Sequence, residues 1–339
     1  MADRVILHVG PNKTGTTALQ HAFVANSALL ARFQIAYPMT GRVLAAHHGI
    51  ADACRSGDAE ALCNLSDEIR YESTALLSSE LFAALEPHEL ERLRRAFGGT
   101  SVEVVYSLRR LSDLWPSHWK EMVKHGLHLS FPEYMLRPPE NDRSTFRAPP
   151  RPSCQLSALA QVFGRENLRL AVYDTRYASD SGFGLGFARD MLGFGEQAGR
   201  FVTSKRNRTP SDWQIEALRH MNLRAVGKLD AAGKRLVARK ALSLLNTDPP
   251  EWVAPFKTVF QRAETVGLSG RSPAVASEQA NVLRGFRDRL IDPVDAYMAN
   301  SETTVRTLEA MSVGAEINAE MDALFHRLSR EFATAGPRR

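Results

Sequence analysis

A short stretch near the N-terminus carries the residue types and spacing of an anion-binding loop. Gly10 and Gly15 frame a turn that contains Lys13, and threonines lie on both sides of the second glycine. Backbone amides in such a turn, together with a basic side chain, attract a phosphate group. The sequence therefore predicts a phosphate-binding loop, with the binding residues Lys13, Thr14, Gly15, Thr16 and Thr17.

The residues on either side of this loop predict the elements that position it. Val5–Val9 is an apolar run rich in β-branched residues, which favours a buried parallel strand. Thr16–Gln20 opens a helix, and the apolar spacing over residues 18–33 predicts one amphipathic helix. A bound phosphate would then face a helix N-terminus, where the backbone dipole favours negative charge.

The position of the lysine distinguishes this loop from that of kinases and nucleoside triphosphatases. Those proteins carry lysine directly after the second glycine, where this chain has Thr16. Lys13 lies inside the turn, so its ammonium group reaches a different part of the ligand. A P-loop kinase or NTPase also needs a strand that ends in aspartate for magnesium, which the sequence lacks. This class of nucleotide-binding protein is the alternative interpretation.

A second strand ends in an acidic residue. Residues 73–80 form a short apolar run that ends in two serines and Glu80. Ligands of open parallel sheets bind beyond the carboxyl ends of the strands, so Glu80 could face the ligand of the first loop. An acid in the first turn of a helix is also favoured by the helix dipole. Spacing alone leaves both interpretations open.

A third strand ends in two arginines. The run from Val102 leads to Arg109 and Arg110, and a helical segment with Ser117 near its start follows. A guanidinium fork and a hydroxyl group can bind the same oxyanion. We therefore predict that Arg109 and Ser117 converge on a second anionic group.

The order of these motifs resembles that of sulfotransferases that use 3′-phosphoadenosine 5′-phosphosulfate (PAPS). The likeness covers roughly residues 1–225 and is greatest to bacterial members that open with a K-T-G-T-T-A-L-Q loop. It implies an α/β fold of three layers, P-loop-like, with a central, mostly parallel sheet and a helical C-terminal extension. It also implies a PAPS-dependent enzyme that releases 3′,5′-phosphoadenosine and needs no metal.

The resemblance implies a role for each motif. Lys13 and the residues up to Thr17 would bind the 5′-phosphosulfate, and Arg109 with Ser117 would bind the 3′-phosphate. Glu80 stands where related enzymes carry a catalytic glutamate or histidine, so Lys13 and Glu80 are the predicted catalytic residues. A basic turn at residues 204–211 would cover the 3′-phosphate or adenine, and its candidates are Arg206 and Arg208. A solvated basic turn is the competing interpretation.

Two histidines compete with Glu80 for the role of general base. His47 and His48 lie between the phosphate loop and the second strand. A solvated or structurally satisfied pair is the simpler interpretation, yet either one could contact the acceptor. The sequence does not decide among the three residues.

The sequence as a whole predicts two regions. Residues 1–225 form the PAPS-binding core, and residues 226–339 form a helical region packed on that core, on the acceptor side or in a dimer contact. An apolar stripe that begins at Ile317 favours packing within the chain, with a homodimer as the alternative. The proline- and arginine-bearing segment 126–153 has the length of a lid or substrate loop.

Composition narrows the class of protein. The net charge of +5 over 339 residues suits an anionic ligand and is too diffuse to indicate nucleic acid. Three cysteines give no disulfide framework, and the start of the sequence carries no signal peptide or apolar membrane span. We therefore expect a cytoplasmic protein. The acceptor, a small molecule or a glycan, cannot be identified, and a non-catalytic nucleotide-binding module is a further alternative.

Overall fold

The computed structural model describes residues 2–137, 148–173, 182–202, 210–298, 302–309 and 312–335. The chain forms two compact units, each built from three segments. The first unit comprises Met1–Leu114, Arg151–Asn207 and Gly270–Ser301, and the second comprises Trp115–Pro150, Arg208–Ser269 and Glu302–Arg339. The domain boundary expected near residue 225 stays a prediction.

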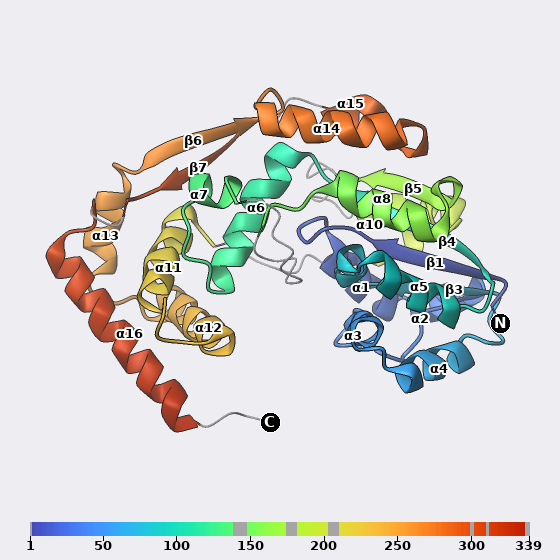
Figure 1. The fold of residues 1–339 in the computed structure, drawn as a ribbon, viewed down its shortest axis with the longest axis horizontal. Coiled ribbons are helices and arrows are strands. Elements are labelled where there is room, and N and C mark those ends of the chain that lie inside the picture. Colours follow the sequence, from blue (N-terminus) through green and yellow to red (C-terminus); the bar gives the residue numbers. More distant parts are fainter. Residues whose placement is uncertain are drawn as a thin grey trace. The chain divides into compact units, whose positions relative to one another are not determined.

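A five-stranded sheet forms the centre of the first unit (Figure 1). Its strand order is β2-β3-β1-β4-β5, and every neighbouring pair is parallel. All carboxyl ends therefore lie on the same edge of the sheet. The strands are β1 (Arg4–Val9), β2 (Ile35–Ala36), β3 (Thr74–Ser78), β4 (Ser101–Leu108) and β5 (Leu168–Val172).

Alternating side chains of the strands form two separate cores. Val5 and Leu7 of β1 point into one core, whereas Ile6 points into the other. Helices cover both faces, which confirms the predicted three-layer α/β fold. The first core includes residues of α3 (His48–Ser56), α4 (Ala59–Glu68), α5 (Pro87–Ala96), α8 (Pro152–Phe163) and α14 (Pro273–Phe286). The second includes residues of α1 (Thr16–Ala25), α2 (Ser27–Arg32) and α10 (Gly182–Asp190).

The prediction of one continuous helix over residues 18–33 is wrong. The structure has two helices there, α1 and α2, which are separated at Asn26. The Asn26 side chain donates to the carbonyl oxygen of Ala22 at 2.7 Å and exchanges two hydrogen bonds with the backbone of Val202. An asparagine that binds a carbonyl of the last turn competes with continuation of the helix.

Short elements complete the first unit. A 3₁₀ helix, η1 (Glu80–Ala84), follows β3, and α15 (Val294–Met298) follows α14. Part of the predicted C-terminal region, α14, thus packs in the same core as α8. The other 3₁₀ helices are η2 (Arg165–Asn167), η3 (Gly195–Arg200) and η4 (Arg287–Arg289).

The second unit is mostly helical but contains an antiparallel strand pair that the sequence did not predict. β6 (Glu264–Ser269) pairs with β7 (Glu302–Thr307). The two strands are separated in the chain by the whole of α14 and α15, so no local hairpin signal exists. The helices are α6 (Leu111–Lys124, which begins in the first unit), α7 (Phe131–Met135), α11 (Asp212–Arg224), α12 (Ala231–Thr247), α13 (Val253–Phe260) and α16 (Ala315–Ala335).

A buried ion pair attaches β7 to α11. Glu216 is fully buried and binds Arg219, with Nη2 to Oε1 at 2.6 Å. The same carboxylate accepts the Leu308 amide at 2.6 Å, and Arg219 donates to the carbonyl of His128 at 3.1 Å. Every charge is thus compensated by hydrogen bonds, which a buried pair requires.

The predicted apolar stripe lies on α16 and is buried within the second unit. Ile317, Met321, Leu324 and Leu328 are each at most 7% exposed. These side chains belong to the core of the chain, as the sequence favoured, and they do not form an exposed surface. The dimer contact predicted for the C-terminal helices therefore has no support from this stripe.

Candidate functional site

The loop after β1 has a backbone that only certain residues adopt. Gly10 has φ of 152°, and a Cβ atom there would lie 2.7 Å from the carbonyl oxygen of Ser107. Glycine is therefore required where the loop approaches β4. Lys13 (φ 73°) and Gly15 (φ 76°) both have left-handed backbones. A strained lysine within a turn suggests that function determines the residue.

The loop leads directly into α1, as the sequence predicted. Thr14 Oγ1 donates to the carbonyl of Pro11 at 2.7 Å, which closes the turn. Gly15 is the N-cap of α1, and no side chain within the described ranges caps this end. The first-turn amides, including those of Thr16 and Thr17, are thus available to an anion.

Arg109 contacts this loop directly. Its Nη1 donates to the carbonyl oxygen of Lys13 at 2.6 Å, and its guanidinium lies 5.6 Å from the ring centre of Tyr173. Burial lowers the pKa of Arg109. Its Nε atom is buried and has no hydrogen-bond partner among the residues that the structure describes. The guanidinium therefore has an open donor next to the loop, as an oxyanion-binding arginine would.

Three other predicted binding residues remain predictions. Ser117 lies on α6, in the segment that belongs to the second unit, whereas Arg109 belongs to the first. Arg206 and Arg208 lie outside the described residues.

Glu80 is the first residue of η1 and has a polar neighbour at each carboxylate oxygen. Gln20 Nε2 donates to Oε2 at 3.0 Å, and His48 Nε2 lies 3.7 Å from Oε1. The carboxylate is mostly buried, with 14% of its side chain exposed. Gln20 lies on α1, directly after the phosphate loop, so one helix links the loop to the carboxylate.

His48 lies between Ser79 and Glu80. Its Nδ1 lies 2.9 Å from Ser79 Oγ, and that oxygen also accepts the Leu81 amide at 3.1 Å. A hydroxyl group can donate to a ring nitrogen or accept from it. When Ser79 donates to Nδ1, the neutral imidazole carries its hydrogen on Nε2, on the side of Glu80.

His47 has a structural role. Its Nδ1 accepts the backbone amide of Ser78 at 3.1 Å, so Nε2 carries the hydrogen and donates to the carbonyl of Pro38 at 3.0 Å. Burial lowers its pKa to about 4. With both ring nitrogens bound to the backbone, His47 is not available to accept a proton from a substrate.

His8 is a buried residue that the sequence analysis did not single out. Its Nδ1 lies 2.8 Å from Ser78 Oγ and its Nε2 lies 2.9 Å from Ser107 Oγ. These contacts join β3, β1 and β4 near their carboxyl ends, and burial lowers the pKa of His8 to about 3. A histidine inside an apolar strand, with serines near the ends of two other strands, was the available signal.

The sheet places the predicted residues in a row. Glu80 follows β3, the loop follows the central strand β1, and Arg109 follows β4. Neighbouring strands lie about 4.8 Å apart, so a carboxylate, an anion-binding loop and a guanidinium stand side by side along one edge. This row can bind an anion with a base on one side and a second cationic donor on the other.

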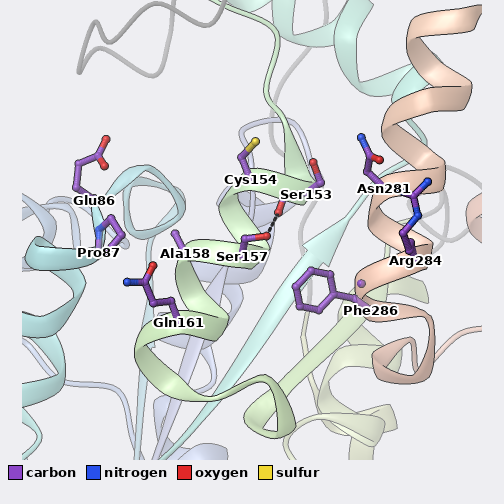
Figure 2. A pocket seen from close by; sticks show the side chains of 11 residues that line it. Glu86, Pro87, Ser153, Cys154, Ser157, Ala158, Gln161, Asn281, Arg284 and Phe286 are labelled. Carbon is purple, nitrogen blue, oxygen red and sulfur yellow. Dashed lines mark hydrogen bonds between the residues drawn. The ribbon is translucent and has the colours of Figure 1, made fainter.

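A surface groove of about 640 Å³ lies apart from these residues, along α8 (Figure 2). Figure 2 shows Glu86 at one side, Arg284 at the other, and Ser157 between them donating to the carbonyl of Ser153 at 2.9 Å. No predicted site residue lines this groove.

In the part of the chain that the structure describes, no group of three or more metal-ligating acidic, histidine or cysteine side chains is present. Within the same ranges, no helix combines the length and hydrophobicity that crossing a bilayer requires.

No protein family model and no curated protein matches the chain. A solved structure of a sulfotransferase from Alicyclobacillus acidocaldarius is similar over 69% of this chain and 99% of that chain, with 20% sequence identity and a TM-score of 0.38. At this TM-score the likeness carries no argument about function, which therefore depends on the geometry of the site.

Proposed function

We propose that this protein transfers a sulfuryl group from PAPS to a hydroxyl group or amine of an acceptor. One observation supports this function above all. Arg109 donates to the phosphate loop from one neighbouring strand, while Glu80 stands at the end of the strand on the other side. PAPS carries two separate anionic groups, which the loop and Arg109 can bind. The acceptor must lose a proton, which Glu80 can accept.

The donor would bind along the loop and β4. Lys13, Thr14, Gly15 and the amides of Thr16 and Thr17 would hold the 5′-phosphosulfate. The open Nε donor of Arg109 suits the 3′-phosphate. Ser117, Arg206 and Arg208 are proposed to complete the 3′-phosphate and adenine site.

The reaction would be an in-line displacement at sulfur. The acceptor oxygen forms a bond to sulfur with its lone pair while the bond from sulfur to the bridging oxygen breaks. The electron pair of that bond leaves with the 5′-phosphate of 3′,5′-phosphoadenosine. Glu80 accepts the acceptor proton, and Lys13 neutralises the charge that grows on the bridging oxygen.

The contacts of Glu80 favour an enzyme over a non-catalytic nucleotide-binding module. Two side chains, Gln20 and His48, face its two carboxylate oxygens. A module that only binds nucleotide needs no oriented carboxylate beside its phosphate loop. A P-loop kinase or NTPase is less consistent with the site, because Thr16 replaces the required lysine.

The acceptor is proposed to be a carbohydrate or another small metabolite. Segment 126–153, of which residues 138–147 lie outside the described residues, and the predicted region 226–339 are the proposed sites of acceptor recognition. The alternative proposal for the latter is a homodimer contact. We propose a cytoplasmic location for the enzyme.

Turnover can be tested with PAPS that is radiolabelled in its sulfur. Incubated with pooled sugars, hydroxy acids, phenols and amines, the protein is expected to transfer label to at least one pool. It should release an equal amount of 3′,5′-phosphoadenosine, because donor cleavage and acceptor sulfation are the same step. Binding of 3′,5′-phosphoadenosine without transfer to any pool would support the non-catalytic module instead.

A further inference from the structure

The segment between β2 and α3 is a tightly braced turn. Glu68 accepts the amides of Met39 at 2.6 Å and Thr40 at 2.8 Å, and the Tyr37 hydroxyl donates to the carbonyl of Ala45 at 2.6 Å. Further on, Val43 and Ala46 pair as an isolated β-bridge. These contacts tie the segment to Glu68 and to itself, and a segment ordered in this way lowers the entropic cost of recognition.

Arg42 lies in this turn, and no charged partner of its side chain is found among the described residues. Its guanidinium is 5.6 Å from the ring centre of Tyr37, and no hydrogen bond or ion pair of its side chain is found within the described ranges. Its Nε atom is buried and unpaired there. A buried donor that lacks an acceptor costs about 1–3 kcal/mol. An oxyanion would remove that penalty.

Arg42 and Glu80 both lie near Tyr37. Burial raises the pKa of Tyr37, the positive charge of Arg42 opposes that shift, and the negative charge of Glu80 adds to it. Both charges therefore act on the same hydroxyl group. They are not paired with each other, because the Glu80 oxygens face Gln20 and His48.

The sheet order indicates which ligand Arg42 would meet. Tyr37 directly follows β2, the edge strand next to β3, whereas the phosphate loop follows β1 on the other side of β3. Glu80 thus separates Arg42 from the loop. The proposed donor occupies the loop and β4, so an anion at Arg42 belongs to the acceptor.

We infer that Arg42 binds an anionic group of the acceptor, so that the acceptor class is a hydroxyl compound that also carries a carboxylate, sulfate or phosphate. The guanidinium fork matches such an oxyanion in shape and charge. It would hold the acceptor with its hydroxyl group at Glu80. This inference rests on the proposed sulfuryl transfer for its assignment to the acceptor.

Matched pairs of small hydroxy acids and their neutral amides test the charge requirement directly. Glycolate, 4-hydroxyphenylacetate and gluconate would each be titrated beside the corresponding amide by calorimetry, with and without 3′,5′-phosphoadenosine. In the wild-type protein at least one acid is expected to bind about 10-fold or more tightly than its amide, because hydrogen bonds to charged groups are the stronger ones. Arg42→Met should remove this preference and Arg42→Lys should retain part of it.

Controls separate the outcomes. Arg70→Met removes an exposed arginine of the same unit and should leave the preference unchanged. Unaltered melting temperature and 3′,5′-phosphoadenosine affinity of Arg42→Met would show that its fold is intact. Equal binding of acids and amides, no binding of any pair, or a preference that survives in Arg42→Met would overturn the inference. Failure of 3′,5′-phosphoadenosine itself to bind would count against the proposed function and not against the charge preference.

Discussion

Replacing Glu80 by glutamine is expected to lower the turnover number by about 10²–10⁴-fold, which is the usual contribution of a general base. The affinity for 3′,5′-phosphoadenosine should stay within about twofold of wild type, since a base acts in the transition state and adds little to donor binding. Turnover of labelled PAPS and calorimetry of the product nucleotide measure the two effects separately.

The contacts of Glu80 explain why this substitution acts beyond the loss of charge. Gln20 donates an N–H group to one carboxylate oxygen, and His48 Nε2 lies 3.7 Å from the other. A glutamine at position 80 has one oxygen and one NH₂ group, so one of these neighbours would face a second donor. Some reorientation of His48 is expected, and its ring signals in NMR spectra would report it.

A surface carboxylate provides the matched control. Glu91 lies on α5 in the same unit and has a loose ion pair with Arg94, at 3.8 Å. Glu91→Gln should leave turnover unchanged. A near-normal rate in Glu80→Gln would mean that Glu80 is not the base, and His48 would then be the residue to replace, because both ring nitrogens of His47 are bound to the backbone.

Lowering the pH from 7 to 5 is expected to reduce the free energy of unfolding by about 6 kcal/mol. Burial lowers the pKa of His8 to about 3, of His47 to about 4 and of His220 to about 3, from an ordinary value of 6.5. In the unfolded chain these three histidines take up protons below pH 6.5, whereas in the folded chain they stay neutral down to about pH 4. Stability is therefore present above pH 6.5 and is lost as the pH falls. Each histidine accounts for about 2 kcal/mol of the change down to pH 5.

Urea unfolding at pH 7, 6 and 5 measures this dependence. Carboxylates with lowered pKa, such as Asp288 and Glu68, take up protons in the unfolded chain mainly below pH 5, so they contribute little within this window. His47→Gln should reduce the change in the free energy of unfolding between pH 7 and 5 by about 2 kcal/mol, since it removes one of the protons that only the unfolded chain takes up. A stability that stays level between pH 7 and 5 would mean that these histidines are not buried in the neutral form.

The strand–loop–helix unit at residues 5–20 and the two neighbouring strand ends could be predicted because their signals are local, and phosphate binding by the loop stays a prediction. Gly10, Lys13 and Gly15 lie within six positions of one another, and Glu80 and Arg109 each end an apolar run. The parallel sheet then brings the carboxyl ends of separate strands to one edge without further information. The three-layer fold was implied by the resemblance to sulfotransferases, and the apolar strand runs agree with its parallel sheet.

The side-chain contacts that hold the predicted site residues in place could not be predicted, because they join residues that are distant in the sequence. His8 meets Ser78 and Ser107 through the register of three strands, and Gln20 meets Glu80 through the packing of α1. Arg42 lies in a turn with no periodicity. The β6–β7 pair joins segments separated by two helices of the other unit, so no local turn marks it.

Calorimetric titration with 3′,5′-phosphoadenosine, adenosine 5′-phosphate and magnesium ATP tests the central claim most directly. The first two nucleotides differ in the 3′-phosphate alone, which is the group assigned to Arg109. We predict that 3′,5′-phosphoadenosine binds at least about tenfold more tightly than either competitor, because a charge-assisted hydrogen bond contributes about 1.5–3 kcal/mol. Equal affinity for adenosine 5′-phosphate, or tighter binding of magnesium ATP, would contradict the assignment of this site to PAPS.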